Sequence, residues 1–342
     1  MSRTRARIIP LPPPSTRRPK ARSEEAWRRQ VRTLEGELRR ERARSDESPG
    51  ALVHLARAAQ AALGGLGWAN LARLQRALYF AWHSEDTDEF GFDRRFAQSL
   101  EPFFEFLYAV WWRVEATGVE RVPGTGPGLI VANHSGVLPY DGLMMRLAVR
   151  HGHPARREAR LLALDMFALL PFLAPLLAKS GAVRANPENG ERLLRKGELV
   201  GVFPEGVKGV GKRFRERYRL ARFGRGGFVR LALRTGAPII PCAIVGAEEI
   251  HPVLAKADWV GRPFGLPYFP ITPTFPALGV LGLLPLPTKW SIDFADPIDL
   301  GGHGAEAAED PILVNRISEE VRTTIQGMID GRLARRRSVW FG

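Results

Sequence analysis

The chain has 342 residues, with 50 Lys and Arg against 36 Asp and Glu, and a formal net charge of +14. This length suits one large α/β domain with helical extensions as well as it suits two domains. Because Cys242 is the only cysteine, an intrachain disulfide and a cysteine-based metal cluster are excluded. A reducing compartment, the cytoplasm, is therefore the simpler expectation.

The N-terminal segment is strongly basic. Of the net charge of +14, the first fifty residues contribute +7, from 14 basic and 7 acidic side chains. Residues 1–22 are rich in Arg and Pro, which predicts a disordered basic arm and no secretory signal. Such an arm suits anionic lipid head groups better than nucleic acid, because aromatic residues are not interleaved with the basic ones. A solvated tail without a partner is the alternative.

Residues 23–99 predict a helical extension. Residues 23–44 form a highly charged helical pattern whose apolar seam is too short to specify a coiled coil. Residues 51–82 predict one or two amphipathic helices, and their tryptophans and arginines suit a membrane interface. Packing of these helices against the rest of the chain is the alternative. An acidic linker is expected near residues 84–89.

From residue 100 onward, an aromatic-rich helix at 100–112 leads into alternating strand and helix patterns. Strands are expected near 128–133, 159–164, 198–203, 238–245 and 290–295, and helices near 139–150, 165–178, 187–196, 225–235 and 312–334. This alternation predicts an α/β domain at 100–334, with a mixed, largely parallel sheet flanked by helices and functional turns at the strand ends. Residues 335–342 are expected to form a basic tail.

The first candidate site follows the apolar run Leu129–Ala132, which delivers His134 into a glycine-containing turn, with Asp141 close behind. Histidine suits general-base work near neutral pH, and a carboxylate can orient its ring. Pro139 suits the first turn of a helix, which would place Asp141 about one turn inside that helix. We expect the two side chains to pair if residues 136–138 bulge. Otherwise a backbone carbonyl would orient the ring.

A second apolar run, Leu199–Phe203, ends in Pro204-Glu205-Gly206-Val207-Lys208. Charged residues, Glu205 and Lys208, again follow the end of a predicted strand. Two charged turns at two strand ends favour one shared active site.

Four segments together resemble the sequence blocks of the glycerolipid acyltransferases, over roughly residues 100–330. They are Asn133-His134…Asp141, Gly181–Arg184, Val202–Gly206 and Ala237–Pro241. The resemblance implies an O-acyltransferase that moves a fatty acyl group from acyl-CoA or acyl-carrier protein to a lysophospholipid hydroxyl, such as that of lysophosphatidate. It implies no further cofactor and no metal.

One departure bears on the acceptor. Six residues separate His134 from Asp141, where the family usually has four. Related branches that acylate diacylglycerol or other neutral alcohols have looser versions of this block. A neutral acceptor therefore stays open, as does a non-catalytic lipid-binding protein.

The resemblance also assigns roles outside the His134–Asp141 pair. Glu205 and Gly206 occupy the block that helps bind the acceptor head group, and the Gly206 backbone N–H is a candidate oxyanion donor. Arg184 and Lys208 would hold a phosphate by charge-assisted hydrogen bonds. A surface salt bridge among Arg184, Glu205 and Lys208 is the structural alternative. The basic cluster from Lys212 to Arg219 either adds to an anion site or is solvated.

Ser135 lacks the Gly-x-Ser-x-Gly elbow of a serine nucleophile. His151 and His153 lie in a predicted loop without a carboxylate at ligand spacing, which disfavours a metal site. The apolar stretch 161–178 is expected to be ordinary core by default, with an acyl groove or a membrane-facing surface as the alternative. The proline-rich stretch 263–288 predicts an apolar loop that covers such a groove or faces a membrane. The overall expectation is a peripheral enzyme on the inner face of the cell membrane, and the oligomeric state is left open.

Overall fold

The computed structural model describes residues 75–76, 79, 86–135, 139–163, 173–257 and 269–342. The chain divides into two compact units, Met1–Arg76 and Ala77–Gly342, and the description below concerns the second. The basic arm at 1–22 and the helices expected within 23–82 lie outside the described residues, apart from residues 75, 76 and 79.

The second unit is built on a seven-stranded sheet with the order β1-β9-β6-β2-β5-β3-β4. All neighbouring strands are parallel except β6 and β9, which are antiparallel. The predicted α/β class with a mixed, largely parallel sheet is therefore confirmed. The strands are β1 (Glu115–Thr117), β2 (Gly128–Ala132), β3 (Ala159–Ala163), β4 (Ala182–Arg184), β5 (Leu199–Val202), β6 (Ile239–Val245) and β9 (Ser291–Phe294). A separate antiparallel pair joins β7 (Ala255–Ala257) to β8 (Phe269–Ile271).

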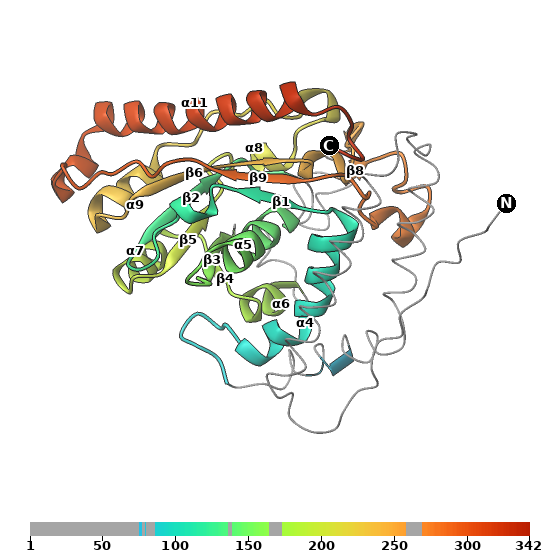
Figure 1. Cartoon of the computed structure of the whole chain (residues 1–342), viewed down its shortest axis with the longest axis horizontal. Helices are drawn as coiled ribbons and strands as arrows, with labels where there is room; N and C mark the ends of the chain where they lie inside the picture. Colours follow the sequence, from blue (N-terminus) through green and yellow to red (C-terminus); the bar gives the residue numbers. More distant parts are fainter. Residues whose placement is uncertain (1–74, 77–78, 80–85, 136–138, 164–172, 258–268) are drawn as a thin grey trace. The chain divides into compact units, whose positions relative to one another are not determined.

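Helices cover both faces of the sheet, with α11 along one face and α5 against the other (Figure 1). They are α4 (Arg94–Phe106), α5 (Tyr140–Gly152), α6 (Leu173–Lys179), α7 (Pro187–Arg195), α8 (Val207–Val210), α9 (Gly227–Thr235) and α11 (Pro311–Arg335). A π-helical turn, Leu107–Trp111, continues α4. Successive residues of the central strands point to opposite faces. Thus Leu129 packs in the core beneath α7, α9 and α11, whereas Ile130 packs beneath α5.

Sharp sequence signals set the starts of two helices that flank the site. The Asn186 side chain caps α7 by accepting from the Asn189 N–H at 2.7 Å, and Pro187 occupies the first turn. A proline costs no hydrogen bond there, since the first N–H groups of a helix have no intrahelical partner. Gly226, with φ of 70°, takes the left-handed conformation before α9 that favours glycine.

The expected domain boundaries need correction. The boundary at 99/100 falls inside α4, which begins at Arg94. The segment near 84–89, expected to be a linker, packs on the sheet domain over its described part. There Asp88 forms an ion pair with Arg160 at 2.6 Å, and the Arg160 guanidinium also stacks on the Phe90 and Phe92 rings. Asp88 and Arg160 are 72 residues apart, so no local pattern reports their pairing.

The C-terminal residues 335–342 belong to the same domain. Arg336 pairs with buried Glu249 at 2.7 Å, and the Lys289 N–H donates to the Val339 carbonyl at 2.9 Å. The side chain of Arg113 also donates to the Trp340 carbonyl. These contacts replace the separate basic tail that was expected.

The proline-rich stretch expected at 263–288 is described from residue 269. It contains β8, a 3-10 turn at Gly279–Leu283, and four exposed leucines, Leu278, Leu281, Leu283 and Leu284. Across the described part of the chain, no helix combines the length and the apolar character needed to cross a membrane.

Candidate active site

The segment that carries His134 is fixed at the carboxyl end of β2. The preceding residue, Asn133, is fully buried, and its side chain both accepts from the Ile244 N–H at 2.7 Å and donates to the Ile244 carbonyl at 2.9 Å. This side chain therefore satisfies the backbone of neighbouring β6 at the place where β2 ends. Asn133 thus sets the point at which the chain leaves the sheet and His134 enters the site. The sequence motif contains Asn133, but nothing local reveals this role.

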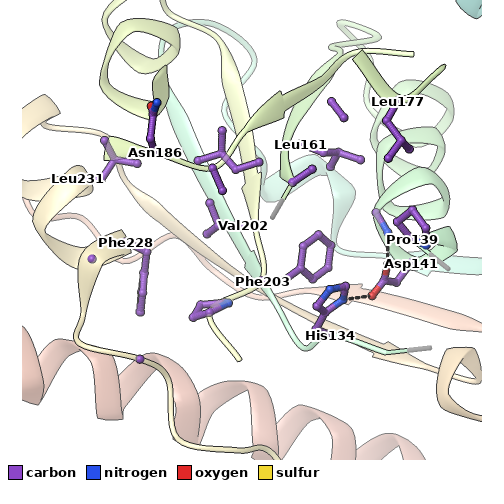
Figure 2. A pocket seen from close by; sticks show the side chains of 18 of the residues that line it. His134, Pro139, Asp141, Leu161, Leu177, Asn186, Val202, Phe203, Phe228 and Leu231 are labelled. Atoms are coloured by element: carbon purple, nitrogen blue, oxygen red, sulfur yellow. Dashed lines mark hydrogen bonds and ion pairs between the residues drawn. The ribbon is translucent and has the colours of Figure 1, made fainter. Parts of the chain in front are cut away.

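His134 and Asp141 lie together, as the sequence predicted for a bulged turn. The His134 Nδ1 lies 2.6 Å from the Asp141 Oδ2, and both side chains are buried (Figure 2). Pro139 precedes α5 as its cap residue, so Asp141 lies in the first turn, nearer the start of the helix than expected. The Asp141 carboxylate also accepts from the N–H groups of Ser135 at 2.9 Å and Gly142 at 2.8 Å. An ionised carboxylate needs such donors when it is buried.

This arrangement selects one form of the imidazole ring. An ionised carboxylate only accepts, so Nδ1 carries the proton and Nε2 keeps its lone pair. The Phe203 ring packs against the imidazole with 4.7 Å between ring centroids. The ring is therefore oriented from one side by a carboxylate and from another by an aromatic side chain. It can accept a proton at Nε2.

Glu205 contacts the site through the backbone of His134. Its Oε1 accepts from the His134 N–H at 3.0 Å and its Oε2 from the Ala221 N–H at 2.7 Å, and the side chain is fully buried. Lys212 Nζ lies 3.1 Å from Oε2. The contacts of this carboxylate are thus with groups of the protein, and its expected contact with an acceptor head group stays a prediction. Within the described residues the ion pair recorded for Glu205 is with Lys212, and not the surface bridge to Arg184 and Lys208 that was the structural alternative.

The other residues of the two expected binding blocks are Gly206, Arg184 and Lys208. The Gly206 N–H donates to the Phe203 carbonyl at 3.0 Å, so the expected oxyanion role would require this hydrogen bond to break. Arg184 is exposed at the end of β4, and Lys208 is exposed in α8. None of these three residues lines the cavity next to His134.

A cavity of about 300 Å³ opens beside His134 and Asp141. Its wall is mostly apolar and comes from the carboxyl ends of β3 and β5 and from the starts of α7 and α9 (Figure 2). Labelled members of the wall are Leu161, Leu177, Val202, Phe203, Phe228 and Leu231. Residues of the stretch 161–178 thus contribute to the wall, where ordinary core was the default expectation. The described residues of 263–288 do not line this cavity, and their expected contact with an acyl chain or a membrane stays a prediction.

The remaining polar candidates have structural contacts. Ser135 is buried, and its hydroxyl lies 3.4 Å from Asp141 Oδ2. His151 is in the last turn of α5 and not in a loop, with its Nε2 2.7 Å from Glu105 Oε1. His153 Nε2 bonds to the Val122 carbonyl. Among the described residues, no group of three or more His, Cys, Asp or Glu side chains could hold a metal ion.

Glu248 is a further buried carboxylate that the sequence did not single out. It lies 3.1 Å from the Nζ of Lys212, and its Oε2 accepts from the Tyr218 N–H at 3.1 Å. Burial raises the pKa of Glu248 to about 7 from its ordinary value of 4.5, although Lys212 acts in the opposite direction. The folded protein therefore binds more protons at this group than the unfolded chain does between these two pH values.

The free energy of unfolding is accordingly expected to lose the contribution of Glu248 as pH rises from about 4.5 through about 7. Glu248→Gln removes this titration, so the variant should gain stability relative to the native protein across that window. Urea unfolding at a series of pH values measures the difference, with exposed Glu120→Gln as the control. A difference that stays constant with pH would contradict this linkage.

A histidine–carboxylate pair at a strand end, beside an apolar cavity, defines a site suited to general-base chemistry on an apolar substrate. The comparison with known proteins agrees with a site for chemistry on an apolar substrate. The sequence model of the Acyltransferase family matches residues 113–245. An uncharacterized protein of Mycobacterium tuberculosis is 52% identical over 256 residues, which are 75% of this chain and 72% of the relative.

Two human proteins are also similar. The DGAT1/2-independent enzyme synthesizing storage lipids is 27% identical over 228 residues, 65% of this chain and 62% of its own. The 1-acyl-sn-glycerol-3-phosphate acyltransferase beta is 30% identical over 143 residues, 40% of this chain and 48% of its own. The chain belongs to the glycerolipid acyltransferase family, and it is an acyltransferase.

Proposed function

We propose that the protein transfers a fatty acyl group from a thioester, acyl-CoA or acyl-carrier protein, to the hydroxyl of a lysophospholipid, with His134 as the general base. The pairing of His134 Nδ1 with Asp141 at 2.6 Å, at the wall of an apolar cavity, carries this proposal. The pairing leaves Nε2 as the proton acceptor. The cavity offers an apolar surface for a fatty acyl chain.

In the proposed reaction, the proton of the acceptor hydroxyl moves to His134 Nε2 while its oxygen attacks the thioester carbonyl carbon. The carbon–sulfur bond then breaks, and the imidazolium returns the proton to the leaving thiolate. Asp141 holds the ring and stabilises its positive charge in the intermediate state. The balance is one ester formed and one thiol released. Ser135 is not acylated in this scheme.

The decisive experiment incubates the purified protein with labelled acyl-CoA, or with labelled acyl-carrier protein, and a panel of acceptors. The panel contains lysophosphatidate, other lysophospholipids, diacylglycerol and long-chain alcohols, and the lipid products are separated. Ester formation on a lysophospholipid is the expected result. Thioester hydrolysis without any lipid product would overturn the proposal.

A neutral acceptor such as diacylglycerol is the second candidate. It is favoured by the similarity to the human storage-lipid enzyme and by the position of Arg184 and Lys208, which do not line the cavity. If the acceptor is instead a lysophospholipid, Arg184 and Lys208 would bind its phosphate. A lysophospholipid acceptor is supported by the similarity to the human 1-acyl-sn-glycerol-3-phosphate acyltransferase beta.

The two acceptor classes are separated by Arg184→Ala and Lys208→Ala. If these side chains hold a phosphate, each variant should raise KM for a lysophospholipid by about 10- to 150-fold, since a hydrogen bond to a charged group contributes about 1.5–3 kcal/mol. The KM for an uncharged alcohol should change far less. Arg195→Ala, which removes an exposed pair with Glu191, is the matched control. Equal losses toward both acceptors, with a raised KM for the donor, would assign the two cations to the donor instead.

We also place a membrane surface among the partners. The exposed leucines between residues 278 and 284 support this assignment, because clustered exposed apolar side chains mark contact surfaces. The lipid acceptor would then be taken from the surface on which the enzyme rests.

A further inference from the structure

We propose that Lys212 is a positioning residue of the active site, which fixes the backbone of His134 through the carboxylate of Glu205. This inference rests on the proposed function, in which His134 must hold one orientation. Lys212 does not line the cavity. Its effect would therefore pass through protein contacts and not through contact with substrate.

The contacts form a continuous buried chain. Lys212 Nζ lies 3.1 Å from an oxygen of Glu205 and 3.1 Å from an oxygen of Glu248. Its own side chain is only 10% exposed. The other oxygen of Glu205 accepts from the His134 N–H at 3.0 Å. Lys212 is thus separated from the His134 backbone by one carboxylate.

These contacts join three segments that leave the same edge of the sheet. His134 follows β2, Glu205 follows β5, and Glu248 lies in the 3-10 turn Ala247–Glu249 that follows β6. The three strands are adjacent and parallel, so their carboxyl ends meet at one edge. Lys212 lies where a single cation can hold two of these segments directly and the third through Glu205.

Close packing makes a displacement of Glu205 reach His134. A Cβ atom added at Gly209 would lie 2.7 Å from the Glu205 Cβ and 2.8 Å from the His134 Cβ. Both distances are shorter than van der Waals contact, so the backbone of Gly209 fills the space between the two side chains. A movement of Glu205 therefore has little room to be absorbed before it reaches the residue that carries the imidazole.

Charge explains why the contact requires a cation. Two buried carboxylates face each other across Lys212, and burial of an unpaired charge is strongly unfavourable. A lysine ammonium has three donors on one atom, which suits a point between two carboxylates. Without that cation, Glu248 would be pushed toward its protonated form, and Glu205 would lose the group that holds it toward the His134 N–H.

The test compares Lys212→Met with Lys196→Met, a control that removes an exposed lysine paired with Glu89. Lys212→Met should lower kcat by about 10- to 100-fold, because small misplacement of a catalytic group is costly. The KM values for donor and acceptor should stay within about threefold, since no substrate contact is removed. A raised KM with an unchanged kcat would overturn the proposal, because it would make Lys212 a substrate-binding residue.

A double variant, Lys212→Met with Glu248→Gln, separates positioning from stability. It removes the lysine together with one of the two charges that the lysine balances, so thermal unfolding should return toward that of the native protein. If Lys212 positions His134, kcat should remain low in this folded variant. Full recovery of kcat together with stability would reduce Lys212 to a purely structural ion pair and overturn the proposal.

A third measurement does not require activity. In protein carrying ¹³C-labelled histidine, the His134 ring signal is identified by its loss in His134→Ala. This signal should shift in Lys212→Met and stay in place in Lys196→Met. An unchanged signal in Lys212→Met would contradict positioning. Absence of acyl transfer by the native protein, with a shifted signal in Lys212→Met, would overturn the proposed function alone.

Discussion

Replacing His134 by alanine is expected to lower acyl transfer by about 10²- to 10⁴-fold, which is the usual contribution of a general base. The physical reason is that a hydroxyl is a poor nucleophile at neutral pH. Among the described residues of the cavity wall, His134 is the one histidine, and it is paired with a carboxylate. Initial rates with a labelled thioester and the preferred acceptor measure the loss.

The matched control is His303→Ala, since His303 is exposed in a surface turn. Circular dichroism and thermal unfolding should show that both variants remain folded. The His134 side chain packs on Phe203, so a modest loss of stability is compatible with the mechanism. Near-native turnover in folded His134→Ala would remove His134 as the general base and, with it, the proposed reaction scheme.

Replacing Asp141 by asparagine is the second large effect, with an expected loss of about 10²-fold or more in kcat. Asparagine has nearly the same shape, but it has no charge to stabilise the imidazolium. Its amide can also donate to Nδ1, which would place the ring proton on Nε2 and leave no lone pair for the acceptor hydroxyl. The loss should therefore fall on kcat, with smaller changes in KM.

Exposed Asp299→Asn serves as the control, because it makes the same chemical change in a surface turn. Asp141 also accepts from the backbone of Ser135 and Gly142, so unfolding must be measured on the same samples. A folded Asp141→Asn variant with activity within a few-fold of the native protein would mean that another group orients His134.

The strands of the sheet could be predicted from the sequence where they are formed by long apolar runs. The runs at 128–132, 199–202 and 239–245 are almost wholly apolar and become the buried, central strands β2, β5 and β6, as parallel sheets require. The three-residue strands β1 and β4 were not predicted as strands. They are too short for a periodic pattern, and they exist because β9 and β3 offer them backbone partners.

The site was predictable only as far as its contacts are local. His134 and Asp141 are seven positions apart, so a strand followed by a helix brings them together. Glu205 reaches His134 across 71 positions, and its motif did not reveal that its carboxylate is directed inward. Lys212 was grouped with a basic cluster that extends to Arg219, whose arginines at 213, 215 and 219 are indeed exposed. Its burial is a property of the tertiary structure.

The hydrogen bonds of Asp141 bear on how distant relatives are found. Its Oδ2 meets both the His134 ring and the Ser135 N–H, so the two ends of the turn are fixed by contacts that do not involve the residues between them. A pattern that fixes the gap between histidine and aspartate at four residues would miss this chain. A search that instead requires a buried strand, a histidine two residues after it, and an aspartate in the first turn of the next helix would retain it, whatever the number of residues in the turn.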